Sequence, residues 1–300
     1  MLHSMGMFYR RKVLLSLLQL FGDELEKIRL QKLLFLFTQR QTKKEYDFVP
    51  YKFGCFSFSA NADLTAMARQ GLINETQTSF VRQDNVNYLQ ELNAEDVDRL
   101  QTIKATFGNV GCNELIRYTY LHYPYWAINS TIADSLLTAS EKNVVLQCKP
   151  KSQKTILFTI GYEGISLEEY LNRLIVNDVN VLVDVRCNPL SMKYGFSKNQ
   201  LQRNCESLGI RYAHFPEVGI RTDQRQNLNG QDDYDKLFAR YTVMTLPQTH
   251  TAQYAILDLL ATHRRIALTC FEVNINQCHR KHLAEAIARL STFDYDMRHI

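Results

Sequence analysis

Three hundred residues exceed what one hydrophobic core usually supports, and a hydrophobic fraction of 45% with 16 Phe and 16 Tyr excludes global disorder. The formal net charge of +4 permits a nucleic-acid partner without requiring one. Seven cysteines, an odd number with no repeated short spacing, indicate reduced thiols in a cytoplasmic protein. The apolar run after Lys12 is too short to cross a bilayer, so we expect no membrane partner, while the oligomeric state stays open.

The first 150 residues are predicted to form a mainly helical domain. Apolar periodicity predicts helices over residues 7–40 (two helices broken at Gly22-Asp23), 61–70, 94–107 and 113–121. Two β-prone pieces flank a turn at Gln83-Asp84-Asn85. Three helices followed by a hairpin is the order of a winged-helix domain, and basic residues are frequent in the first 50 positions, so we expect this half to bind double-stranded DNA.

The segments RLQKLLFLF and YKFGCFSFSANADLTAMARQGLI also resemble the winged-helix-like modules of phage-associated and toxin–antitoxin proteins. The resemblance covers about a third of this half. It implies the same fold and the same kind of partner.

A polar stretch over residues 147–154, with Pro150 among lysines, predicts a boundary between two domains. Beyond it strands alternate with helices, which predicts a mostly parallel, Rossmann-like α/β sheet with helices on both faces. A long polar loop is expected over residues 219–231. The predicted strands are TILFTIG, VNVLVDVR, IRYAHFP and RIALTCFE, and the predicted helices are SLEEYLNRLIVND, NQLQRNCESLG, DDYDKLFARYTVM, TAQYAILDLLATH and CHRKHLAEAIARL.

Polar side chains follow these strands where they end, which is the edge at which open α/β sheets bind ligands. Glu163 follows the first strand, Asp184 and Arg186 end the second, and Glu272 ends the fourth. We expect the four to converge as catalytic residues, with Asp184 or Glu272 as a general base or a stabiliser of positive charge. The alternatives are a structural loop cap for Asp184 and an ion pair of Glu272 with a neighbouring arginine.

The motifs TIGYEG, LVDVRCNPLSMKYGFSK, GIRYAHFPEVG and ALTCFEVNINQCHRKHLA together resemble the "domain of unknown function 488" family, in the family's order and over nearly all of residues 155–295. Cys270 and Cys278 match the pair of cysteines that marks the family. The resemblance implies the α/β fold and leaves the reaction open.

The cysteines admit three interpretations. Cys270 lies within an apolar strand and is predicted to be a buried, inert thiol. Cys278 begins a helix beside His279 and Arg280, which would lower a thiol pKa, so it is a candidate nucleophile. The third interpretation is a zinc ion held by Cys270, Cys278 and His279. The C-x7-C-H spacing matches no common zinc ribbon, so we expect no metal and no other cofactor.

Substrate-binding residues are expected at the same edge. The loop NPLSMKYGFSK interleaves aromatic residues with lysines, which suits base stacking and phosphate contact, although a packed lid is the alternative. Arg280 is a candidate phosphate ligand or a plain surface arginine, and His214 faces this edge or the core. The full set is Tyr162, Asn188, Lys193, Tyr194, Phe196, His214, Cys278, His279 and Arg280.

These residue types favour a nucleic-acid-directed hydrolase of the DNA glycosylase type, which cleaves the N-glycosidic bond of a normal or modified base. Defence against phage is part of this hypothesis. No dinucleotide, P-loop or zinc-deaminase fingerprint is present. The rival hypotheses are a thiol-dependent enzyme using Cys278 and a non-catalytic DNA-binding regulator that senses a small ligand.

Overall fold

The computed structural model describes residues 6–225, 228 and 230–300, and it divides into two compact units between Lys149 and Pro150. The division falls inside the polar stretch that the sequence indicates as a linker. Among the described residues, no helix combines the length and the apolar character needed to cross a membrane.

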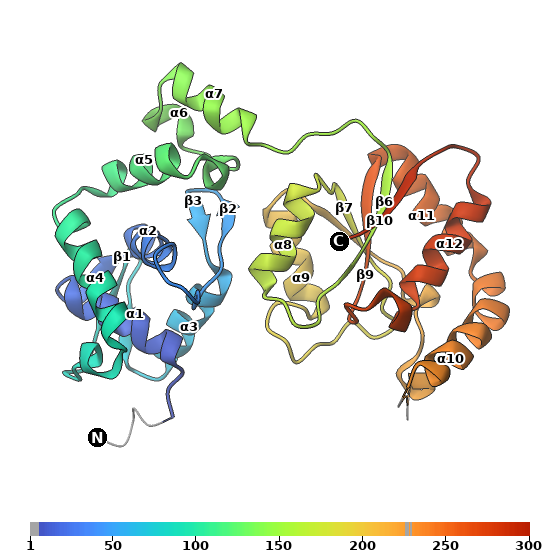
Figure 1. Ribbon diagram of the computed structural model, residues 1–300, viewed down its shortest axis with the longest axis horizontal. Coiled ribbons are helices and arrows are strands. Elements are labelled where there is room, and N and C mark those ends of the chain that lie inside the picture. The colour runs from blue at the N-terminus through green and yellow to red at the C-terminus, as the bar shows by residue number, and fades with distance from the viewer. Residues whose placement is uncertain (1–5, 226–227, 229) are drawn as a thin grey trace. The chain divides into compact units, whose positions relative to one another are not determined.

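The N-terminal unit begins as a winged helix. The order α1, β1, α2, α3, β4, β5 and the antiparallel sheet order β1-β5-β4 are those of this fold. A hairpin of β2 and β3 is inserted between α2 and α3 (Figure 1). The elements are α1 (Tyr9–Leu20), β1 (Glu24–Glu26), α2 (Lys27–Thr38), β2 (Val49–Tyr51), β3 (Gly54–Phe56), α3 (Phe58–Arg69), β4 (Ile73–Glu75), β5 (Ser79–Arg82), α4 (Ala94–Phe107), α5 (Cys112–His122), α6 (Ala133–Leu136) and α7 (Ala139–Gln147).

The wing lies earlier in the chain than the sequence predicts. Its turn spans residues 76–78, where the Thr76 amide donates to the Ser79 carbonyl at 2.9 Å, and not residues 83–85. Arg82 ends β5 because its guanidinium binds Asp84 at 2.9 Å and the Val86 carbonyl at 2.7 Å, so the chain leaves the sheet there. The expected second strand of that hairpin is instead a loop and a 3-10 helix.

Many basic residues of the first 50 positions are held inside this unit. Asp63 of α3 is buried and accepts hydrogen bonds from Arg10 Nε at 2.6 Å, Arg11 Nε at 2.8 Å and the Tyr46 hydroxyl at 3.0 Å. This cluster ties α3 to α1, so Arg11 contributes to folding more than to an external surface, while Arg10 stays 42% exposed. On α3 itself, Asn61 and Arg69 are exposed.

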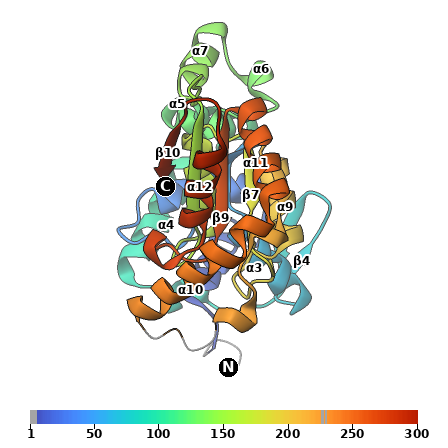
Figure 2. The same ribbon diagram turned by 90° about the vertical axis from the view of Figure 1, so that its right-hand side faces the viewer.

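The C-terminal unit is a five-stranded, fully parallel sheet of order β10-β6-β9-β7-β8, covered by helices on both faces (Figures 1 and 2). Helices α8 and α9 cover one face, and α10 to α12 cover the other. The Rossmann-like prediction is confirmed. The elements are β6 (Ile156–Gly161), α8 (Leu167–Val176), β7 (Val181–Asp184), α9 (Lys198–Ser207), β8 (Arg211–His214), α10 (Gln231–Met244), α11 (His250–His263), β9 (Arg265–Cys270), α12 (Arg280–Leu290) and β10 (Asp296–His299).

The edge strand β10 is absent from the sequence prediction. All four of its residues are exposed, so it carries no apolar pattern. It pairs in parallel with β6, and His299 Nδ1 lies 2.6 Å from Thr159 Oγ1. The predicted polar loop over 219–231 contains a short 3-10 helix, Thr222–Arg225, while residues 226, 227 and 229 of that loop lie outside the described residues.

The two units predict a specific pattern of limited proteolysis. Trypsin should cut first after Lys151, which is exposed, because the Lys149–Pro150 bond is a poor substrate and the Lys154 carbonyl is bound by Arg265 of the C-terminal unit. Mass spectrometry should find two fragments that resist further digestion. Lys151→Gln is the control and should slow this cut; first cuts within α1 to α5 would contradict two independently stable units.

Candidate active site

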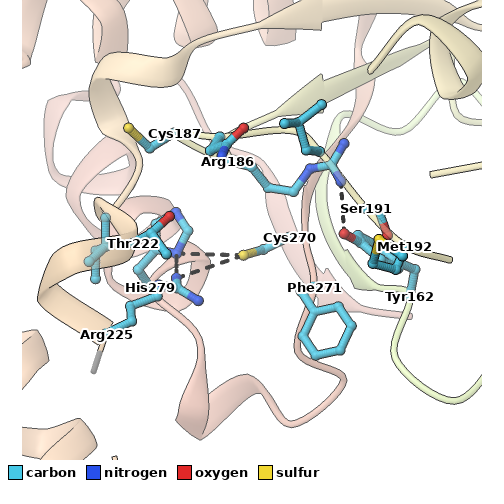
Figure 3. Close-up of a pocket in the computed structure, with 13 residues that line it drawn as sticks. Tyr162, Arg186, Cys187, Ser191, Met192, Thr222, Arg225, Cys270, Phe271 and His279 are labelled. Carbon is cyan, nitrogen blue, oxygen red and sulfur yellow. Dashed lines mark hydrogen bonds between the residues drawn. The ribbon is translucent and has the colours of Figure 1, made fainter. Parts of the chain in front are cut away.

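A cavity of about 280 Å³ opens at the carboxyl edge of the C-terminal sheet (Figure 3). It lies where the chain leaves β6, β7 and β9, and the 3-10 helix Thr222–Arg225 adds one wall. Its lining residues are Tyr162, Arg186, Cys187, Asn188, Leu190, Ser191, Met192, Ile220, Thr222, Arg225, Cys270, Phe271 and His279.

One glycine shapes this edge of the sheet. A Cβ atom at Gly161 would lie only 2.0 Å from the Glu272 carbonyl oxygen, so a side chain here would displace the loop after β9. Arg280, at the start of α12, holds the same loop, since its guanidinium donates to the carbonyls of Glu272 and of Val273. Arg280 is 2% exposed. The expectation of a phosphate ligand at this position is therefore replaced by a structural role.

Asp184 and Arg186 form a buried ion pair. Asp184 accepts from Arg186 Nε at 2.8 Å and from an Arg186 terminal nitrogen at 2.5 Å, and the Tyr212 hydroxyl adds a third bond at 2.6 Å. Arg186 also donates to the Tyr162 hydroxyl at 2.8 Å and to the Phe196 carbonyl at 2.9 Å. Both charges are thus fully compensated, which is what burial of an ion pair requires.

The sequence predicts that Asp184 and Glu272 converge, but the pleat of the sheet directs the side chain of Asp184 away from the cavity. Asp184 pairs in register with Thr269, whose hydroxyl binds Tyr170 of α8, so Asp184 lies on the face covered by α8 and α9. Cys270, the next residue of β9, belongs to the core under α10 to α12. The side chain of Asp184 does not line the cavity.

Cys270 instead has the surroundings of a reactive thiol. Its Sγ donates to Glu272 Oε2 at 3.1 Å and lies 3.7 Å from His279 Nδ1 and 4.0 Å from an Arg225 terminal nitrogen. Arg225 also binds the Glu272 carboxylate and His279 Nδ1, the latter at 2.9 Å. Figure 3 shows Cys270 facing His279 and Arg225 across the cavity.

The hydrogen bonds of this cluster polarise its thiols in opposite directions. The bond from the Cys278 thiol, with His279 and Arg225 beside the sulfur, holds the pKa of Cys270 well below its usual value despite burial. Burial and the neighbouring Cys270 raise the pKa of the Cys278 thiol well above its usual value. Burial, together with Cys270, also raises the pKa of Glu272. Cys270 is therefore the thiol of the pair that ionises more readily, and Cys278 is its hydrogen-bond donor.

The sulfur atoms of Cys270 and Cys278 and one ring nitrogen of His279 lie within 4.8 Å of one another, a donor set that suits a thiophilic metal. Arg225 is hydrogen-bonded to the imidazole at this point and contacts the Cys270 sulfur. A guanidinium thus supplies the positive charge that a metal would bring. We therefore interpret the group as a thiol–imidazole–guanidinium cluster.

Several predicted substrate-binding residues lie at the cavity. Tyr162, Asn188 and His279 line it, and Lys193 Nζ donates to the Tyr162 carbonyl at 2.7 Å. His214 lies behind the cavity, with Nε2 2.9 Å from the Arg186 carbonyl. Tyr194, 46% exposed, lies outside the lining, as does Glu163, whose carboxylate accepts from the Val273 amide at 3.2 Å.

Two predicted substrate contacts are corrected by burial. Phe196 is fully buried and stacks on Tyr162 with ring centroids 4.2 Å apart, so its ring is not available to a base. Cys278 is also fully buried and does not line the cavity. Both side chains support cavity residues from behind.

The sequence missed three residues of this site. Arg225 lies in a polar loop without periodicity, and Tyr212 lies in a half-buried strand, so neither gave a local signal. Cys270 was taken for inert core because its strand is apolar. The usable signal was its position as the last residue of β9, at the edge where ligands bind.

The family model described as "Domain of unknown function DUF488" matches residues 166–287. The C-terminal half of this chain contains a DUF488 domain. The match includes Asp184, Arg186, Cys270, Glu272 and the Cys278–Arg280 segment, while β6 precedes it and β10 follows it. No curated protein matches the chain.

The compensated ion pair predicts a structural rather than a kinetic phenotype for Asp184→Asn. The substitution leaves Arg186 buried without its counter-ion, so we expect the free energy of unfolding of the DUF488 domain to fall by about 3 kcal/mol or more, as measured by urea denaturation. Asp223→Asn is the matched control, since its pair with Arg221 is exposed and should contribute less than about 1 kcal/mol. Equal stability of the two variants would refute the structural assignment.

Proposed function

We propose that the DUF488 domain is a thiol-dependent hydrolase whose nucleophile is Cys270. The observation that carries the proposal is the 3.1 Å hydrogen bond from Cys270 Sγ, which lines the cavity, to Glu272 Oε2 directly behind it. A nucleophile within reach of a proton acceptor, which is in turn oriented by a third group, is the arrangement that activates a catalytic thiol. Here the orienting group is Arg225.

The reaction follows from these contacts. Glu272 takes the proton of Cys270, and the thiolate attacks an electrophilic carbon of the substrate, forming a carbon–sulfur bond. The leaving group departs with the bonding electron pair and receives the proton from Glu272. Water, deprotonated by Glu272, then attacks the same carbon and returns the thiolate, so the net reaction is hydrolysis. The Cys278 thiol stabilises the thiolate throughout by its hydrogen bond.

This mechanism keeps Glu272 as a catalytic residue. Its second catalytic residue is the nucleophile Cys270 and not Asp184. Asp184 is enclosed by Arg186 and Tyr212 on the face of the sheet away from Cys270, whereas Glu272 accepts a hydrogen bond from the Cys270 thiol. It also replaces Cys278 by Cys270 in the thiol hypothesis, because Cys270 lines the cavity and Cys278 does not.

For the substrate we retain the N-glycosidic bond of a nucleic-acid base. Phe271, 43% exposed, could stack on an extruded base, and Asn188 could bind its edge. The attacked carbon would be the sugar carbon that bears the base, and Glu272 would protonate the departing base. The winged-helix topology of the N-terminal unit supports duplex DNA as the partner, with Asn61 and Arg69 exposed on α3.

The nucleophile assignment predicts which cysteine reacts first. Iodoacetamide at pH 6 should alkylate Cys270 before the other six cysteines, because a thiol with a lowered pKa remains partly ionised where ordinary thiols are protonated. Peptide mass spectrometry over a time course gives the rate at each position. Arg225→Gln removes a positive charge beside the sulfur, so it should raise the pKa of Cys270 and slow its labelling roughly tenfold, the equivalent of one pKa unit.

Cys187 is the internal control, since it lines the same cavity and is more exposed to the reagent than the buried Cys270. Labelling of Cys187 at the rate of Cys270 would show that access alone decides reactivity. Faster labelling of Cys278 would instead support the rival thiol hypothesis of the sequence analysis, in which Cys278 is the nucleophile.

The substrate assignment predicts release of free base from duplex DNA. Normal and hypermodified DNA should be incubated with the protein and analysed by mass spectrometry, and Cys270→Ser should reduce release at least ~100-fold. Affinity for the same duplex should fall steeply with salt, and Arg69→Gln should reduce the salt slope by about one. No release from any DNA, with Cys270 still reactive, would leave a thiol enzyme with another substrate.

A further inference from the structure

The winged-helix unit contains a second, larger cavity, of about 660 Å³, bounded by α2, the β2–β3 hairpin and the wing turn. Its walls are largely apolar, and aromatic rings from the hairpin and the wing, Tyr51, Phe53, Phe56 and Phe80, form much of the lining. A cavity of this size and character is typical of sites for small organic ligands.

The hairpin that forms one wall is an insertion into the winged-helix order and is held rigidly. Gly54 adopts a φ of +88°, and a Cβ atom there would lie 2.5 Å from the Tyr120 ring of α5. Glycine therefore allows the hairpin to turn tightly and to pack on α5. The Tyr51 ring lies 5.1 Å from the Phe56 ring across the hairpin, measured between centroids. The cavity is thus enclosed by packed structure on this side.

Lys32 of α2 is the unusual member of the lining. Its side chain is 2% exposed, and its amino group donates to the Cys55 carbonyl at 2.8 Å. Within the described part of the chain, no carboxylate forms an ion pair with it. Glu26, the carboxylate in the lining, instead accepts a hydrogen bond from the Cys112 thiol.

A buried ammonium without a counter-ion is costly, and burial accordingly lowers the pKa of Lys32. An anionic group in the cavity would remove this cost, because the ammonium has donors left after its bond to Cys55. The apolar walls at the same time favour a ligand whose remaining atoms are aliphatic or aromatic.

We propose that this cavity binds a small organic acid, with its apolar body against the aromatic walls and its anionic group on Lys32. The site belongs to the winged-helix unit and does not depend on the chemistry of Cys270. It gives the DNA-binding half of the chain a ligand-sensing function of its own.

The test titrates the full chain with two fluorescent probes of similar shape, of which only one carries an anionic group that can bind Lys32. 1-Anilinonaphthalene-8-sulfonate carries an anionic group, and N-phenyl-1-naphthylamine does not. Lys32→Met removes the terminal amino group and its charge but keeps the rest of the unbranched side chain, so the affinity for the sulfonate should fall at least about tenfold, while that for the neutral amine should stay unchanged. Lys104→Met, the same substitution outside the cavity, should behave as the unmodified protein.

Equal sulfonate affinity of Lys32→Met and the unmodified protein, both with cooperative thermal unfolding, would overturn the proposal. Loss of both probes by a folded Lys32→Met variant would do so as well, because it would show a requirement for shape and not for charge. If Lys32→Met does not fold, competition on the unmodified protein decides. Decanoate should displace the neutral probe at concentrations at least about tenfold lower than decanol, and equal displacement by both would refute an acid site.

Discussion

The buried ion pair of Asp184 and Arg186 organises the carboxyl edge of the C-terminal sheet. Two charges in a protein interior are tolerated only when their hydrogen-bonding groups are satisfied, and here the partners come from around three strands. Tyr162 follows β6, Asp184 ends β7 and Tyr212 lies on β8, while the Phe196 carbonyl belongs to the loop before α9. The pair therefore determines where that loop returns to the sheet, and with it the wall of the cavity.

The alternation of side chains along the strands assigns different tasks to the two faces. On the face of α8 and α9, the ion pair, the Tyr162–Phe196 stack and the Tyr170–Thr269 hydrogen bond are all internally satisfied. On the other face, Cys270 and His279 meet Arg225 at the cavity. The two faces meet at consecutive residues of β9. Thr269 lies on the face of the compensated ion pair, and Cys270, the polarised thiol, lies on the other.

The sequence predicted the features that depend on local pattern. Continuous apolar runs identified the three inner strands β6, β7 and β9, and polar residues after them identified the edge that carries the cavity. What it missed depends on neighbours distant in the chain. The sequence favours Cys278 over Cys270 as the reactive cysteine, and the contacts of Cys270 with Glu272 and Arg225 reverse that order. The edge strand β10 forms without an apolar pattern, because it needs only the backbone of β6 as a template.

The single passage of the chain between Lys149 and Pro150 has a consequence for how such a protein can arise. The C-terminal unit completes its own sheet by pairing its last strand with its first, β10 with β6, so both of its ends lie in one closed piece of structure. One genetic crossover within the linker would therefore transfer the whole domain without dividing a helix or a strand. Lineages could in this way join the same α/β domain to different N-terminal domains, and inherit the two units separately.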